Sequence, residues 1–436
     1  MVSHGNERYF NKSELVERYA EHPSGGPASS SGREQRPSQV GRSRGHRYGR
    51  CGSGGASRAP AERDRHPLRA RCRADGTGAS AFFARDNGLI GVRRRNLYSA
   101  LLLAALMTVS GSSAGPKRGD PAFDIYARPG DMVEISPGRR LNLRCSGEGP
   151  ITVLLESGLG YPSYSWRLVQ PEVARFARVC SYDRAGLGFS DPGPMPRRAS
   201  AIADDLEALV DKAGVRPPLL LVGSSLGSQS VRIFAFRQPE QVHALLLVDP
   251  YAEGQYPALA KVDPSIMHEN AQVLAAERRC IDLLRTGRLS ARAAERLGCI
   301  ASPDPSFSRH LATVIRKQRM TSAGYEAAFS ESEQLETGSE EDVRREYRKL
   351  NEVPVIVLSA GRNFSGGRYS PASIAQLNRV QLALHGRLAA VSAAGCVKPV
   401  PEAGHVIHVD APAVVIAEIR RLVAGAPTCP GRKTAN

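Results

Sequence analysis

From about residue 132 onward, eight short apolar runs follow one another along the chain and predict β-strands. The middle runs, such as PLLLVG (218–223), are apolar at consecutive positions rather than at alternate ones. A strand of this kind is buried on both faces, which is typical of a parallel sheet covered by helices on both sides. The runs cover residues 132–136, 139–145, 151–156, 177–182, 218–223, 244–249, 354–359 and 396–401.

Helical patterns lie between several of these runs, at 199–214, after Leu226 and at 412–425. Alternation of strands and helices predicts a doubly wound α/β fold with a mostly parallel eight-stranded sheet. Residues 251–350 interrupt the alternation, because they are rich in Ala, Leu and charged residues and favour helices throughout. We expect them to form a helical lid inserted after the sixth strand. The lid divides the core into a first part and a second part, residues 130–250 and 351–425.

The strand PLLLVG runs directly into GSSLG (223–227), where an apolar run meets a helical pattern. A strand that turns sharply into a helix holds the turn residue in a strained conformation and projects its side chain at the helix N-terminus. The residues two before and two after it must be small. Ser225 has Gly223 and Gly227 at those positions, whereas Ser224 has Val and Leu. We therefore predict that Ser225 is a nucleophile; the alternative is a Gly/Ser turn without chemistry.

A serine hydroxyl is a weak nucleophile until a base accepts its proton, so a histidine is expected near a strand end. The segment PVPEAGHVIHVDAP follows the last strand and contains two. We predict that His405 is the base, because it lies nearer the strand end and the small Gly404 lets its loop approach the nucleophile. His408 is the competing candidate, and a purely structural histidine is the alternative interpretation.

With these segments in view, the chain resembles the α/β-hydrolase fold superfamily. The resemblance covers roughly residues 130–425, apart from the insertion, and implies serine-type catalysis on this sheet. It implies no particular substrate, since the superfamily hosts many chemistries. Two departures, Ser157-Gly158 for the frequent HG and GSSLGS for the frequent GHSxGG, leave the main-chain donors in place. The similar segments are GSSLG (223–227), ESGLGYPSYSW (156–166), YDRAGLGFSDPGP (182–194), LLLVDP (245–250) and GHVIH (404–408).

The resemblance also requires an acid that orients the histidine and stabilises the imidazolium. In many relatives this acid follows the seventh strand, but residues 354–401 contain no Asp or Glu. Glu402 is too close to His405 in the sequence to orient it readily. Some relatives keep the acid at the end of the sixth strand, where LLLVDP places Asp249. Asp249 is therefore the expected acid; the alternative role is to cap the strand end through local amides.

Two main-chain amides are expected to form the oxyanion hole. One belongs to Leu226, which follows the nucleophile at a helix N-terminus. By resemblance, the other belongs to Leu159, in the loop after the third strand. The segment DRAGLG (183–188) is expected to shape the rim of the site, with Asp183 and Arg184 as structural ion-pair residues rather than catalytic ones.

The formal net charge of +16 is concentrated near the N-terminus. Residues 1–95 hold 19 Lys and Arg against 9 Asp and Glu, whereas the rest of the chain holds 40 against 34. No nucleic-acid partner is therefore expected for the folded body. Residues 1–91 are rich in Gly, Ser, Pro and Arg, which predicts a disordered leader outside the mature protein. The alternative is an arm that binds nucleic acid through its charge.

Residues 92–114 have the layout of a secretory signal peptide. Three arginines precede a 13-residue apolar stretch, 97–109, and small residues then lead to Ala114. Cleavage after Ala114 is expected, and Val92 is a candidate translation start. The apolar stretch is too short to span a bilayer comfortably, so no stable membrane anchor is expected. The pattern predicts a secreted or periplasmic protein; a membrane anchor is the alternative if 97–109 stays uncleaved.

Six cysteines follow the predicted cleavage point, and an even number in an exported chain favours disulfides. The alternative is six reduced, buried thiols. Strand neighbours in the resembling fold suggest Cys145–Cys180, and a helix–turn–helix in the lid suggests Cys280–Cys299. Cys396 then remains for Cys429 in the C-terminal tail, residues 426–436.

Together these patterns predict a secreted serine hydrolase that cleaves an ester or related acyl bond of a small molecule through Ser225, His405 and Asp249. The chain shows no cofactor or metal motif, so no cofactor is expected. Acyltransferase, lactonase and amidase chemistry remain open, as does a non-catalytic binding protein on the same fold. The sequence does not determine the substrate or the oligomeric state.

Overall fold

The computed structural model describes residues 119–426 of the chain. They contain an eight-stranded sheet with the strand order β1-β2-β4-β3-β5-β6-β7-β8. The pairs β1–β2 and β2–β4 are antiparallel, and every other neighbouring pair is parallel. The predicted mostly parallel eight-stranded sheet is therefore confirmed. The strands are β1 (Asp131–Ser136), β2 (Arg139–Ser146), β3 (Thr152–Glu156), β4 (Arg178–Tyr182), β5 (Leu219–Ser224), β6 (Val242–Val248), β7 (Val355–Ala360) and β8 (Gly395–Val400).

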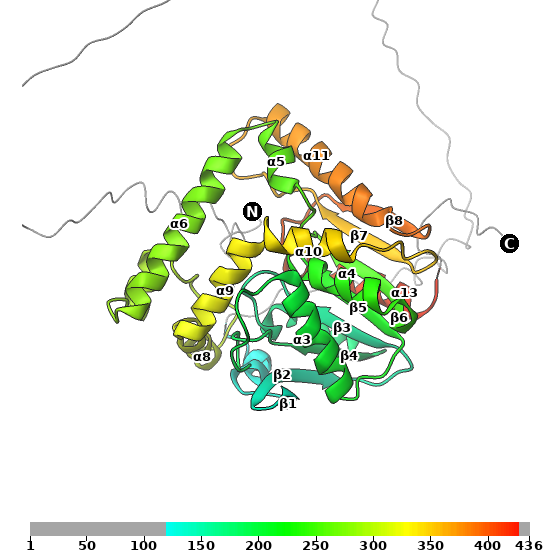
Figure 1. Cartoon of the computed structure of the whole chain (residues 1–436), viewed down its shortest axis with the longest axis horizontal. Helices are drawn as coiled ribbons and strands as arrows, with labels where there is room; N and C mark the ends of the chain where they lie inside the picture. The colour runs from blue at the N-terminus through cyan, green and yellow to red at the C-terminus, as the bar shows by residue number, and fades with distance from the viewer. Residues whose placement is uncertain (1–118, 427–436) are drawn as a thin grey trace, which may run out of the picture. The chain divides into compact units, whose positions relative to one another are not determined.

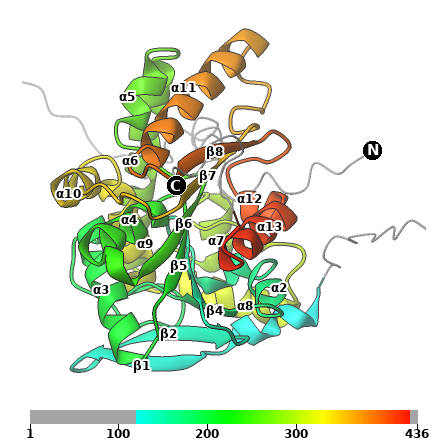
Figure 2. The ribbon, with the colours of Figure 1, turned by 90° about the vertical axis from the view of Figure 1, so that its right-hand side faces the viewer.

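Helices cover both faces of this sheet, as Figure 2 shows with the sheet seen near its edge. Helices α3 (Ala199–Lys212), α4 (Gly227–Arg237) and α11 (Pro371–Ala389) pack on one face. On the opposite face lie α2 (Gln170–Val173), α12 (Ile407–Asp410) and α13 (Pro412–Val423). Short 3₁₀ helices are η2 (Pro121–Ala127), η3 (Ser163–Trp166) and η4 (Pro239–Gln241).

The central strand β5 is apolar at four consecutive positions, Leu219–Val222, because helices cover both of its faces. Leu219 and Leu221 belong to the core on the α3–α4 side, and Leu220 and Val222 belong to the core on the α13 side. All four side chains are fully buried. Successive strand residues point to opposite faces, so a strand between two helical layers needs apolar residues on both. Each such side chain contributes roughly 1.5–3 kcal/mol of burial free energy.

A helical insertion follows β6 and precedes β7, as the sequence predicts (Figure 1). None of the helices within residues 119–426 is long and apolar enough to cross a membrane. The predicted leader (1–91) and signal segment (92–114) lie outside the described residues. The insertion consists of α5 (Gln255–Ala260), α6 (Ser265–Arg285), α7 (Ala291–Arg296), α8 (Arg309–Arg319), α9 (Ser322–Gln334) and α10 (Gly338–Glu346).

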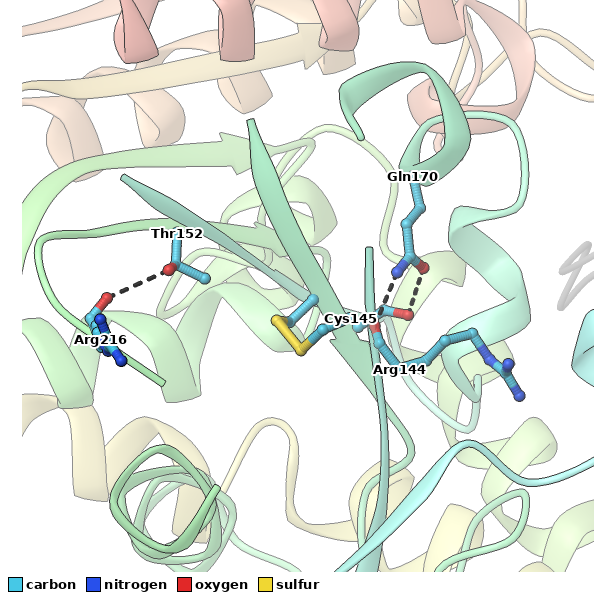
Figure 3. The surroundings of a disulfide bond; sticks show 7 residues. Arg144, Cys145, Thr152, Gln170 and Arg216 are labelled. Carbon is cyan, nitrogen blue, oxygen red and sulfur yellow. Dashed lines mark hydrogen bonds between the residues drawn. A yellow bond between two sulfur atoms is a disulfide. The ribbon is translucent and has the colours of Figure 1, made fainter. Parts of the chain in front are cut away.

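Two of the three predicted disulfides are present in the described residues. Cys145 of β2 and Cys180 of β4 are direct partners in the antiparallel register, and their disulfide joins the two strands (Figure 3). Beside it, the Gln170 side chain donates a hydrogen bond to the Arg144 carbonyl, which holds α2 against β2. The second disulfide, Cys280–Cys299, joins α6 to the turn after α7. The third pairing stays a prediction, because Cys429 lies outside the described residues.

Candidate active site

The turn between β5 and α4 has the geometry that the sequence pattern predicts. Ser225 is its central residue and has a φ of 51°, in the left-handed region that non-glycine residues rarely adopt. A Cβ on Gly223 would lie 2.7 Å from a Val231 methyl carbon, and one on Gly227 would lie 2.5 Å from the Ser157 carbonyl oxygen. Neither position has room for a side chain, so the two glycines allow the tight turn that presents Ser225.

The three predicted side chains meet at the carboxyl edge of the sheet. The His405 Nε2 lies 2.9 Å from the Ser225 Oγ, and the His405 Nδ1 lies 2.6 Å from the Asp249 Oδ2. Ser225 follows β5 and Asp249 follows β6, which are adjacent parallel strands, while His405 comes from the loop after β8. The Asp249 carboxylate is buried, whereas 45% of the His405 side chain is exposed. This arrangement provides a proton path from a serine hydroxyl to an imidazole held by a carboxylate.

Asp249 accepts hydrogen bonds from several groups besides His405. The Ala360 amide and the Gln381 side chain donate to Oδ1 at 2.8 and 2.9 Å, and the Asn363 side chain donates to Oδ2 at 2.7 Å. Burial alone would raise the pKa of this carboxyl. Hydrogen bonding and charge from His405 and the Ala360 amide outweigh burial, so that the pKa of Asp249 is lowered. The surroundings therefore favour a carboxylate at this position.

Sequence reasoning missed these donors. Asn363 follows β7 and Gln381 lies on α11, in the same segment that contains no acidic residue. His385 also lies on α11, and its two ring nitrogens contact the Ser359 hydroxyl and the Pro250 carbonyl. The one sequence feature that could have indicated these donors is a polar side chain on the buried face of α11. The segment after β7 thus supplies hydrogen-bond donors to the Asp249 carboxylate.

His408, the competing histidine, occupies a different environment. It is buried, and its ring stacks on Trp166 with 4.2 Å between the ring centroids. Burial, followed by the charges of Arg167 and His405, lowers the pKa of His408 to about 3. It is His405, not His408, that the structure brings to Ser225.

The loop after β3 passes close to Ser225. A Cβ on Gly158 would lie 3.4 Å from the Ser225 Cβ, so this loop approaches the elbow without steric overlap. Leu226 is the N-cap residue of α4, and Leu159 packs beside it in one apolar cluster. Within residues 119–426, neither of their amides donates a hydrogen bond to the protein backbone or to a side chain. Ser157, which replaces the frequent histidine, contacts the Ser165 hydroxyl.

The expectation for Asp183 and Arg184 needs one correction. Arg184 forms buried ion pairs with Glu156 and Glu331. Asp183 forms no ion pair with any part of the chain that the structure describes. Its carboxylate instead accepts hydrogen bonds from the main-chain amides of Ser163 and Phe189 and from the Asn142 side chain. Asp183 therefore holds turns by capping their amides, which sequence spacing alone did not distinguish from ion pairing.

Among residues 119–426, no group of three or more His, Cys, Asp and Glu side chains is arranged to hold a metal ion.

Comparisons with known proteins agree with this architecture. A model of the alpha/beta hydrolase family matches residues 153–418. An AB hydrolase superfamily protein of Gibberella zeae is 25% identical over 306 residues, covering 64% of this chain and 88% of that protein. A 2-hydroxymuconate semialdehyde hydrolase of Pseudomonas sp. strain CF600 is 34% identical over 117 residues, which is 26% of this chain and 41% of the relative. The crystal structure of wild-type DBJA has a similar fold, with a TM-score of 0.50, 17% identity and coverage of 70% of this chain and 100% of DBJA.

Proposed function

Because the chain belongs to the alpha/beta hydrolase family, we propose that it is a serine hydrolase that cleaves a carboxylic ester or a related acyl bond. The observation that carries the proposal is the hydrogen-bonded series from Ser225 through His405 to Asp249. A serine at the elbow, with a base in contact, is suited to forming a covalent acyl-enzyme.

In the first half of the proposed reaction, the Ser225 Oγ attacks the acyl carbon of the substrate. The hydroxyl proton passes to the His405 Nε2, while the Nδ1 proton remains hydrogen-bonded to Asp249. The carbonyl oxygen becomes an oxyanion, and the bond between the acyl carbon and the leaving alcohol then breaks. The alcohol oxygen takes the proton from Nε2, and the acyl group stays on Ser225.

In the second half, water takes the place of the alcohol. The water oxygen bonds to the acyl carbon while His405 accepts a proton from the water. His405 then returns that proton to the Ser225 oxygen as the bond between the acyl carbon and Ser225 breaks. The products are a carboxylic acid and the free serine. Asp249 keeps its charge throughout, which its donors and its lowered pKa favour.

The amides of Leu159 and Leu226 would receive the oxyanion in both halves. Leu226 lies at the N-terminus of α4, where the helix dipole also favours negative charge. Removal of one such donor typically costs about 10²–10³ in kcat. The apolar side chains of both residues, together with Tyr251 and Leu335, form a cluster beside the nucleophile, which suits an apolar acyl group.

The test uses a fluorophosphonate probe and a panel of acyl esters with the purified protein. We expect labelling of one serine, identified by mass spectrometry of the peptides as Ser225, and hydrolysis of at least one ester. Ser225→Ala should abolish both, whereas the matched control Ser224→Ala should retain most activity. Labelling of Ser224, or an unlabelled and inactive folded protein, would contradict the proposal.

We also propose that the protein is exported as a mature chain that begins near Gly115. The disulfides Cys145–Cys180 and Cys280–Cys299 support this, because such bonds persist in oxidising compartments. Mass spectrometry of the exported fraction, prepared without reductant, should find no free thiol and no peptide from residues 1–91. Free thiols, or a mature protein that keeps those residues, would contradict export.

A further inference from the structure

The Arg184 guanidinium is fully buried next to the loop that passes the nucleophile. All five of its N–H donors are used. One bonds the Glu156 carboxylate at 2.7 Å, and two bond Glu331 at 2.7 and 2.8 Å. The remaining two bond the main-chain carbonyls of Ser157 and Gly158, each at 2.7 Å. Arg184 thus fixes two consecutive peptide carbonyls immediately before Leu159.

Glu331 holds the other side of the same residue. It lies on α9 of the helical insertion and is completely buried. Besides pairing with Arg184, its Oε2 accepts a hydrogen bond of 2.8 Å from the Gly160 amide. The carbonyls before Leu159 and the amide after it are therefore held by a single buried ion pair. The orientation of the Leu159 amide depends on both partners, because a residue held on both sides has little freedom to rotate.

The contact surface of α9 allows this approach. A Cβ on Gly160 would lie 3.3 Å from the Ala328 Cβ, and one on Gly186 would lie 2.7 Å from the Ala327 Cβ. Gly324 lies about one turn before these alanines and Glu331 about one turn after them on the same helix. Small residues thus let α9 pack directly on the loop after β3 and on the 183–188 loop, and Glu331 extends from this face into the core.

Two buried carboxylates, Glu156 and Glu331, pair with Arg184. Burial raises the pKa of Glu156 and outweighs the opposite effect of Arg184 and of the Tyr182 hydrogen bond. Tyr182 donates to the second Glu156 oxygen. Burial thus disfavours the charge on Glu156, and Glu331 binds the guanidinium through two hydrogen bonds against one for Glu156. Removing the Glu331 charge would take away one of the two buried carboxylates that pair with Arg184.

We propose that Glu331 is a positioning residue for the oxyanion hole, acting through Arg184 and the Gly160 amide to aim the Leu159 amide at the nucleophile. The inference rests on the proposed serine hydrolase function. It makes helix α9 of the insertion a structural part of the proposed catalytic site. Its effect should appear in the transition state, where the oxyanion is present, and not in ground-state substrate binding.

The principal variant is Glu331→Gln, which preserves the side-chain size but places an amide against donors. The matched control is Asp304→Asn, which disrupts another buried ion pair between the insertion and the core, Arg167–Asp304. Asp304 forms no hydrogen bond with residues 157–160 among those described. Each protein is assayed for kcat and KM on an ester that the wild type hydrolyses, for inhibition by a trifluoromethyl ketone with the same acyl group, and for melting temperature.

We expect Glu331→Gln to lower kcat by about 10²-fold, the effect of losing one oxyanion donor, with KM within about threefold of wild type. The adduct of the trifluoromethyl ketone mimics the oxyanion, so the affinity for this inhibitor should fall by a similar factor. Asp304→Asn should lower the melting temperature without either effect. Glu331→Asp, which keeps the charge, should recover part of kcat. If Glu331→Gln does not fold, Arg184→Lys provides the same test, since lysine keeps a charge but cannot hold two carbonyls and a carboxylate in one plane.

Unchanged kcat and inhibitor affinity in a folded Glu331→Gln or Arg184→Lys protein would overturn the inference, even if the melting temperature falls. An equal loss of kcat in Asp304→Asn would overturn it as well, because the effect would then follow stability. Failure of the wild type to label with fluorophosphonate or to hydrolyse any ester would instead overturn the proposed function, and the inference with it.

Discussion

The burial of His408 predicts a measurable dependence of the free energy of unfolding on pH. Its ring is buried against Trp166, and neither ring nitrogen has a hydrogen-bond partner among residues 119–426. Burial lowers the pKa of His408 to about 3 in the folded protein, whereas an unfolded histidine titrates near 6.5. Between these values the unfolded chain binds a proton that the folded chain does not. The free energy of unfolding therefore falls as the pH is lowered through this window.

The size of the effect follows from the two pKa values. Each pH unit inside the window changes the free energy of unfolding by about 1.4 kcal/mol, so lowering the pH from 7 to 4 costs about 3 kcal/mol at this residue. His408→Phe keeps a flat ring against Trp166 but cannot be protonated. The loss of stability from pH 7 to pH 4 should therefore be about 3 kcal/mol smaller in His408→Phe than in wild type.

Urea unfolding at pH 7 and pH 4, followed by tryptophan fluorescence, measures both losses. The control is His268→Gln, which removes an exposed histidine on α6. It should reproduce the wild-type difference between the two pH values. Equal losses in wild type and His408→Phe would refute the reasoning, because they would mean that His408 is protonated equally in the folded and unfolded chains.

Four further changes have defined outcomes. Asp249→Asn should lower kcat by roughly 10³–10⁴, since the amide favours the wrong His405 tautomer; a loss below tenfold in a folded variant would place the acid elsewhere. Gly227→Ala should destabilise the fold by roughly 1–3 kcal/mol in urea unfolding and suppress fluorophosphonate labelling, and wild-type behaviour would contradict the tight elbow. Replacing both cysteines of Cys145–Cys180 by serine should lower the free energy of unfolding by about 4 kcal/mol. The same replacement in Cys280–Cys299 should lower it by about 3 kcal/mol, and unchanged unfolding midpoints would contradict both values.

The sequence allowed Ser225 to be distinguished from Ser224 because steric requirements at the elbow are local. Only one frame gives glycine at both positions where a Cβ would overlap its neighbours. The parallel strands were also predictable, since burial on both faces leaves a continuous apolar run. Asp249 was reached through the absence of acidic residues after β7, which is a property of composition rather than of three-dimensional arrangement.

The partners of these residues could not be predicted in the same way. Glu331 lies 147 residues from Arg184 in the sequence, within a run of helices whose order in space depends on tertiary packing. Gln381 lies on α11 among apolar residues. From the sequence alone, a glutamine there is as consistent with a partly exposed position as with a buried one. A buried polar group is explained by its partner, and the partner is known only once the chain is folded.

The connection between β6 and β7 determines when the site can become complete. Roughly 100 residues separate these neighbouring strands, and closing a flexible loop of that length costs about 4 kcal/mol of chain entropy beyond a constant term. Ser225 and Asp249 precede this connection, whereas Asn363, Gln381 and His405 follow it. An N-terminal segment that ended before β7 would therefore contain Ser225 and Asp249 but not His405. For the proposed reaction this order means that the base is the last of the three side chains to be synthesised, so an N-terminal segment without the loop after β8 should not react with a fluorophosphonate.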